Sequence, residues 1–178
     1  MEQFEAYSYF NNIQLSLNLT KDFHFARISD PASMEEVLSN FTKHKEFFCI
    51  DDTNDGTTFE AGGGFFERRI YIVHLIKNYS LKTKDSMTQQ KVALEQCRQI
   101  YRKVVSKLIS DKEANLNGLT YLNTRIPFYE YPGYMFTGAT GIYFIVSIDV
   151  PTDLCYKSAD WDESALRKMD NTFDTTFQ

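Results

Sequence analysis

The chain has 178 residues, a formal net charge of −5, and 43% hydrophobic and 24% charged residues. These values are typical of one globular domain and exclude general disorder. No dense run of Lys or Arg is present, so we expect no basic surface that attracts nucleic acid or an anionic membrane. We also expect no signal peptide and no membrane span, since no apolar run approaches about 18 residues.

The first third predicts short helices and one short strand. Residues 1–29 form an N-terminal extension, in which the apolar spacing over residues 4–17 is loosely helical. A short strand is expected at His24–Ile28. Ser33 and Glu36 then match a capping box, and apolar residues follow at helical spacing, which predicts a second short helix with the stripe Met34, Val37, Leu38 and Phe41.

Two predicted strands flank a segment rich in turn-forming residues. The strands are Phe47–Ile50 and Phe65–Ile76, and the second is apolar on both faces, which predicts a central strand covered on both sides. We expect its second cover to come from another subunit or from the N-terminal helices. Between the strands, Asp51–Gly64 combines an aspartate-rich run with three glycines, and we interpret it as one long flexible loop.

The segment does not match two familiar kinds of binding loop. A calcium loop of the EF-hand type starting at Asp51 would need Glu at its twelfth position, which is Gly62. A phosphate-binding loop would need Lys and Ser or Thr after its glycines, whereas Phe65 and Phe66 follow Gly64. A solvated turn and a flexible hinge are the preferred interpretations, so no metal or nucleotide site is predicted here.

The strongest helical pattern lies at Ser86–Ile109. Ser86 and Gln89 resemble a capping box at its start. Polar and charged residues occupy one face, and the opposite face carries an apolar stripe made of Ala93, Cys97, Ile100, Tyr101, Val104, Val105 and Leu108. This pattern predicts one long amphipathic helix that packs on a sheet.

The last third returns to strand patterns. Segments Phe128–Tyr131 and Tyr134–Phe136 flank a predicted turn at Pro132-Gly133. In Ile142–Val150 an apolar residue occupies every second position from Ile142, and Ser147 and Asp149 are expected to point outward. An acidic C-terminal tail, residues 156–178, follows, with a short helix expected at residues 162–170. The fold class is therefore predicted as α+β: a mostly antiparallel β-sheet with one long amphipathic helix packed on it and shorter N-terminal helices, in a single domain of residues 1–155.

No local pattern predicts catalysis. His24, His44 and His74 share no motif, and His74 is expected to be a hydrogen-bonded core residue. The three cysteines, Cys49, Cys97 and Cys155, are widely spaced and predict neither a disulfide framework nor a zinc site. We expect a non-enzymatic protein without cofactor or metal, and a site assembled from distant residues remains the alternative.

The order strand, loop, strand, long helix and terminal strands resembles the tail-terminator and head–tail connector (tail completion) proteins of long-tailed bacteriophages and prophages. The strand Phe65–Ile76, the helix Ser86–Ile109 and the segment Tyr131–Pro151 carry this resemblance, which covers about residues 30–155. The run Asp51–Gly56 also looks like loops found in prophage versions.

The resemblance implies a structural protein of virion assembly, present in the host cytoplasm and then in the virion. It implies a homo-oligomeric ring, usually of six subunits, that joins the tail tube to the head and contacts tail-tube and neck proteins, without sequence-specific nucleic-acid binding or membrane contact. The segment Asp51–Gly64 would be its contact arm. The candidate interaction residues in this arm and at the adjoining strand end are Asp51, Asp52, Asp55, Phe59, Phe65, Arg68 and Arg69. Another neck, baseplate or secretion-apparatus component remains the alternative function.

Overall fold

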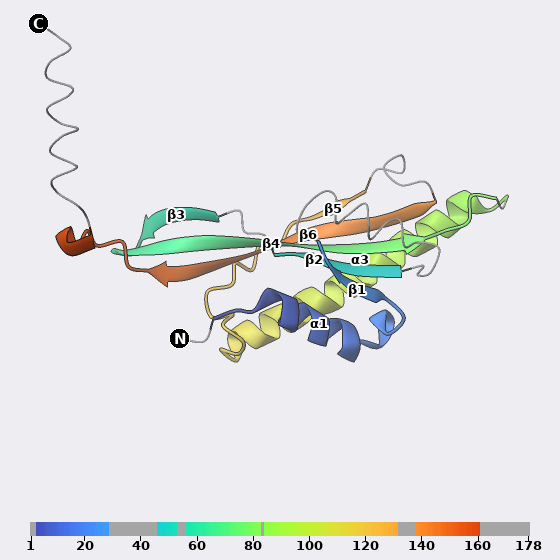
Figure 1. Ribbon diagram of the computed structural model, residues 1–178. Coiled ribbons are helices and arrows are strands. Elements are labelled where there is room, and N and C mark those ends of the chain that lie inside the picture. Colours follow the sequence, from blue (N-terminus) through green and yellow to red (C-terminus); the bar gives the residue numbers. More distant parts are fainter. Residues whose placement is uncertain (1–2, 29–45, 53–55, 83, 132–137, 161–178) are drawn as a thin grey trace, which may run out of the picture.

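The computed structural model describes residues 3–28, 46–52, 56–82, 84–131 and 138–160. It is an α+β fold with one mixed, mostly antiparallel sheet of six strands, a long helix and a shorter N-terminal helix (Figure 1). The elements in chain order are α1 (Ala6–Ser16), η1 (Asn18–Thr20), β1 (His24–Arg27), β2 (Glu46–Asp51), β3 (Gly56–Ala61), β4 (Gly64–Asn78), α3 (Ser86–Glu113), β5 (Phe128–Glu130), β6 (Ala139–Thr152) and η3 (Ser158–Asp160).

The strand β4 is the centre of the sheet, as the sequence predicts. The strand order is β1-β2-β4-β6-β5, and β3 also pairs with β4. Along one edge of β4, β6 pairs antiparallel over almost the whole strand. Along the other edge, β2 and β3 pair with successive parts of β4. The one parallel pair is β1 with β2, so the predicted antiparallel character is confirmed for the rest of the described sheet.

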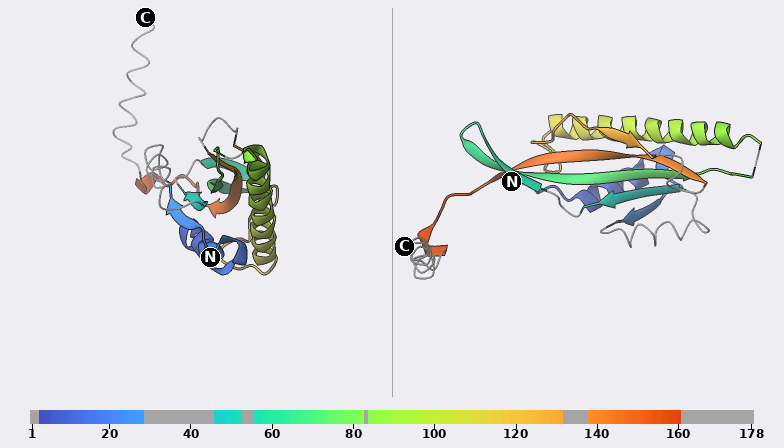
Figure 2. Two further views of the ribbon diagram at one scale, coloured as in Figure 1. Left: turned by 90° about the vertical axis from the view of Figure 1, so that its right-hand side faces the viewer. Right: turned by 90° about the horizontal axis from the view of Figure 1, so that it is seen from above.

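Both helices lie on the same face of the sheet (Figures 1 and 2). They share one core cluster with the strands, in which the side chains from α1, α3, β2, β4 and β6 include Phe10, Cys97, Ile100, Val104, Leu108, Phe48, Val73, Leu75, Phe144 and Val146. The predicted amphipathic helix is confirmed, and it continues four residues beyond Ile109 to Glu113. The apolar pattern ends earlier because the next buried residue of the helix is Asp111, which is polar.

The opposite face of the sheet carries no described helix. One end of it holds a second buried cluster, made of Ile28, Phe47, Cys49, Ile76, Tyr131 and Ala139. We call the rest of this face, around Ile70, Ile72 and Ile145, the open face. Ile72 on β4 lies opposite Ile145 on β6, and both are half-buried. The expectation that N-terminal helices cover this face is wrong for α1, because Phe10 packs against Phe48 in the helix-side core. Several further predictions lie outside the described residues: the helix around Ser33–Phe41, the turn Pro132-Gly133, the strand Tyr134–Phe136 and the helix at 162–170.

The prediction of one long loop at Asp51–Gly64 is wrong for most of this segment. Asp51 ends β2, and Gly56–Ala61 forms β3, which is joined to β4 by a two-residue turn at Gly62 and Gly63 with φ of 61° and 78°. Two consecutive positive φ angles are typical of a tight hairpin turn, which glycine adopts without strain. In the sheet register, Asp51 of β2 stands opposite Ile72 and Gly56 of β3 stands opposite Arg69, so β2 and β3 pair with successive parts of β4.

The long helix supplies a direct test of the core. We expect Val104→Asp to lower the free energy of unfolding by more than about 3 kcal/mol, because it places an unpaired charge in the core. Val104 is 1% exposed, whereas the neighbouring Lys103 is exposed. Urea unfolding followed by circular dichroism measures the change. Lys103→Asp, the control, should change the stability by less than about 0.5 kcal/mol; comparable losses for both would contradict the assigned helix orientation.

A close approach between β4 and β6 supplies a second test. A Cβ atom on Gly141 would collide with the backbone carbonyl of Leu75 on the neighbouring strand. We therefore expect Gly141→Ala to cost about 2 kcal/mol or more in thermal or urea unfolding. Gly64→Ala is the matched control, since its Cβ would meet only ordinary contacts at 3.9 Å or more. Equal stability of the two variants would show that the strands are farther apart at Gly141 than described.

Candidate functional site

One end of the sheet extends beyond both helices and forms an arm (Figures 1 and 2). The arm consists of residues 56–69 and 148–152, which belong to β3, the first part of β4 and the end of β6. The turn Gly62-Gly63 lies at its tip. The arm is built by the same antiparallel pairing as the body of the sheet, so its strands are held by backbone hydrogen bonds although no described helix covers them.

Aromatic rings and one guanidinium group gather on the open face of the arm. Phe59 and Phe66 are cross-strand neighbours and stack with 5.8 Å between ring centroids. The guanidinium carbon of Arg68 lies 5.0 Å from the centroid of Phe59. Tyr121, from the connection after α3, meets the edge of Phe66 at 6.0 Å. Stacked rings beneath a cation are mutually attractive, so the group has a fixed arrangement.

Asp149 completes this group, which we call the arm cluster: Phe59, Phe66, Arg68, Tyr121 and Asp149. Asp149 stands opposite Arg68 in the sheet register, and its two carboxylate oxygens accept hydrogen bonds of 2.7 and 3.0 Å from Arg68. This hydrogen-bonded carboxylate raises the pKa of Arg68. Both side chains are partly exposed, so the pair contributes little to stability, but its two-point geometry orients the guanidinium over Phe59.

A hollow of about 340 Å³ lies beside the arm cluster. It is lined by Phe59, Ala61, Phe66, Lys112, Thr120, Tyr121, Leu122, Asn123 and Asp149. Lys112 donates a hydrogen bond of 2.6 Å from Nζ to the backbone carbonyl of Leu122. The described lining holds no His or Cys and combines aromatic rings with one ammonium and one carboxylate group.

The structure brings together only two of the residues predicted for the interaction site. Phe59 and Arg68 meet in the arm cluster. Phe65 and Arg69 alternate to the other face of β4, where Arg69 pairs with Glu67 at 3.0 Å and Phe65 is 41% exposed. The predicted interaction residues on β4 therefore lie on two different faces, because successive strand residues face opposite ways.

The predicted acidic residues lie elsewhere. Asp51 ends β2, and Asp52 accepts a hydrogen bond of 2.7 Å from Arg27, the last residue of β1. Asp55 lies outside the described residues. Sequence reasoning missed Tyr121, whose position depends on a single bridge between Leu122 and Ile148.

The histidine in β4 is half-buried and hydrogen-bonded, and we interpret it as a structural residue. His74 Nδ1 hydrogen-bonds with the hydroxyl of Tyr131, and the two rings stack at 6.1 Å between centroids. Burial lowers the pKa of His74 to about 4, so the imidazole is neutral at pH 7. Burial likewise raises the pKa of Cys49, which is opposite His74 on β2, to about 12. Within the described parts of the chain, no group of three His, Cys, Asp or Glu side chains is placed to hold a metal ion.

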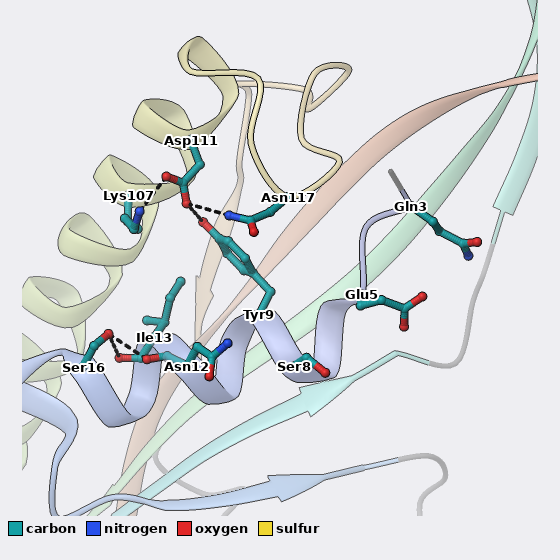
Figure 3. A pocket seen from close by; sticks show the side chains of 10 residues that line it. All are labelled: Gln3, Glu5, Ser8, Tyr9, Asn12, Ile13, Ser16, Lys107, Asp111 and Asn117. Atoms are coloured by element: carbon teal, nitrogen blue, oxygen red, sulfur yellow. Dashed lines mark hydrogen bonds and ion pairs between the residues drawn. The ribbon is translucent and has the colours of Figure 1, made fainter. Parts of the chain in front are cut away.

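A second hollow, of about 390 Å³, lies between α1 and the end of α3 (Figure 3). Its main feature is the nearly buried Asp111, whose carboxylate accepts hydrogen bonds from Tyr9 Oη at 2.8 Å, from Lys107 Nζ and from Asn117 Nδ2. Because these groups bind one another, they hold α1 against α3. We interpret this cluster as structural.

The Asp111 cluster predicts a dependence of stability on pH. Burial raises the pKa of Asp111, but the hydrogen bonds from Lys107 and Tyr9 outweigh it and hold the pKa below its ordinary value of 3.8. A lowered native pKa adds stability above the unfolded pKa, and this contribution is lost as the pH falls through the native pKa. We expect Asp111→Asn to lower the free energy of unfolding at pH 7 by about 1–3 kcal/mol and to weaken the loss of stability on acidification below about pH 4.

Urea unfolding at a series of pH values measures this effect. Glu113→Gln, an exposed carboxyl change on the same helix, is the control and should leave both the stability and its pH profile nearly unchanged. An Asp111→Asn profile parallel to the native one would contradict the role assigned to Asp111.

No described helix is both long and apolar enough to cross a membrane. No protein-family model matches the chain, and no curated protein matches its sequence. The interpretation of the arm and the open face therefore depends on their own geometry.

Proposed function

We propose that the chain is a non-enzymatic structural subunit that assembles with copies of itself. Its role would be that of the tail-terminator and head–tail connector proteins that it resembles, which is to join tail tube to head through a ring of subunits. The observation that supports this proposal best is that both described helices cover one face of the sheet, while the open face beside the second buried cluster is apolar and half-exposed at Ile70, Ile72 and Ile145.

The composition of the open face favours a protein partner. Ile70, Ile72, Tyr143 and Ile145 are all half-buried on neighbouring positions of β4 and β6. Tyr129 on β5 stacks on Tyr143 at 5.0 Å and is 47% exposed. Contiguous apolar side chains with tyrosines at their border are typical of interaction surfaces.

The arm supports the same function. It projects past the helices, where a neighbouring subunit or a tail-tube protein can reach it, and it presents the arm cluster on the same side as the open face. Aromatic residues and Arg are the types enriched at interface centres. With a net charge of −5, the chain would not hold DNA that passes through a ring. The proposed setting is the host cytoplasm during assembly and then the virion.

Sedimentation velocity over a wide range of protein concentrations tests this proposal. We expect concentration-dependent assembly that is strongly weakened by Ile145→Lys, since a lysine on the open face must be desolvated when a partner covers it. Lysine can extend its ammonium group to water in the separate subunit, so folding should be retained. Met87→Lys, at a position on α3 that is 72% exposed, is the matched control and should assemble normally. A chain that stays strictly monomeric, alone and with its tail-tube protein, would contradict the proposal.

A further inference from the structure

The outer edge of β3 is the most open edge of the arm. Within the described residues, β3 pairs with β4 alone. On the same side of β4, the outer edge of β2 pairs with β1. This pairing ends at Ile28, whose backbone N–H donates a hydrogen bond to the carbonyl of Ile50. The position next to β3, in line with β1, is not occupied by any described strand.

The hairpin register determines which backbone groups of β3 point outward. Ala61 and Gly64 close the two-residue turn, and in such a hairpin the closing residues exchange both of their backbone hydrogen bonds. Antiparallel pairs then alternate between hydrogen-bonded and non-hydrogen-bonded positions. The N–H and C=O groups of Gly56, Thr58 and Glu60 therefore point away from β4, toward the open edge.

This edge lacks the protection that the other edge of the arm has. Exposed edges are usually blunted by Pro, Lys, bulges or a covering segment, and β3 consists of Gly-Thr-Thr-Phe-Glu-Ala. On the opposite edge, the N–H of Asp149 donates to the carbonyl of Tyr121, and the next outward position is Pro151, which has no N–H. Of the two edges of the arm as described, the β3 edge is thus the one that can accept another strand.

We propose that the β3 edge pairs with β3 of a second copy of this chain, antiparallel across a two-fold axis at Thr58. This inference rests on the proposed function in one respect, namely that the chain self-associates. The contact is isologous, so it is separate from the head-to-tail contacts that close a ring. It would place the partner's strand in line with β1, at the position that no described strand occupies.

The sequence of β3 fits this pairing with itself. Thr58 would stand opposite its own copy, and paired threonines are favourable cross-strand neighbours. Glu60 would stand opposite Gly56, so the single charge of the strand would not meet another carboxylate. On the other side of the strand, Phe59 would lie beside the partner's Thr57 and extend the existing stack of Phe59 on Phe66.

The first test removes one outward N–H. Thr58→Pro deletes this donor in each copy without removing a hydrogen bond between β3 and β4, and Pro is tolerated where a strand N–H faces outward. Thr58→Val keeps the N–H and the shape of the side chain, so it is the matched control. In sedimentation equilibrium, we expect Thr58→Pro to raise the concentration of half-dissociation about tenfold or more and Thr58→Val to change it little.

The second test reports the register directly and does not depend on how well the arm tolerates proline. Cys155 is exposed while Cys49 and Cys97 are buried, so Cys155→Ser provides a background for single introduced thiols. Thr58→Cys should form disulfide-linked dimers on mild oxidation, because directly opposed Cα atoms are about 5.5 Å apart, within the range that a disulfide spans. Glu60→Cys is the control: its two copies would be about 14 Å apart and should not cross-link.

The outcomes separate this inference from the proposed function. Weakened association of Thr58→Pro together with cross-linking only at position 58 supports the β3 pairing. Normal association of Thr58→Pro and no cross-linking at position 58, in a chain that still assembles, would overturn the pairing and leave the proposed function in place. A chain that is monomeric at every concentration would overturn both.

Discussion

The antiparallel pairing of β4 with β6 is the constraint on which the rest of the structure depends. It determines which side chains face the helices, because residues alternate between the two faces of a strand. Val73 and Leu75 stand opposite Phe144 and Ile142, and all four are fully buried beneath the helices. A slip of one residue between the strands would move each apolar set to the wrong face.

The same pairing determines both candidate interaction surfaces. Once Val73 and Phe144 face the helices, Ile72 and Ile145 must face away from them, toward the open face. The strands then continue past the helices as the arm, where the same register places Arg68 opposite Asp149. The helix side is closed by apolar packing and by the Asp111 cluster, and one end of the opposite face is closed by a second buried cluster. The open face and the arm are therefore the candidate surfaces for other proteins.

The long helix and the two long strands could be predicted because each repeats its pattern over many residues. The strand β3 could not, since its short sequence lies between an aspartate-rich run and three glycines that are also typical of a loop. It becomes a strand because Gly62 and Gly63 adopt positive φ and return the chain onto β4. The arm cluster was partly predictable: Phe59 and Arg68 lie near each other in sequence, whereas Tyr121 arrives from a distant connection that has no periodic pattern.

The central claim is that association covers the open face and leaves the helix side exposed. Hydroxyl-radical labelling of the protein at low and at high concentration, with detection by mass spectrometry, tests it directly. The account predicts that labelling of Tyr129 and Tyr143 falls as the protein assembles, while labelling of Met87 on α3 stays constant. Unchanged labelling of both tyrosines in the assembled protein, or loss of labelling at Met87 instead, would contradict it.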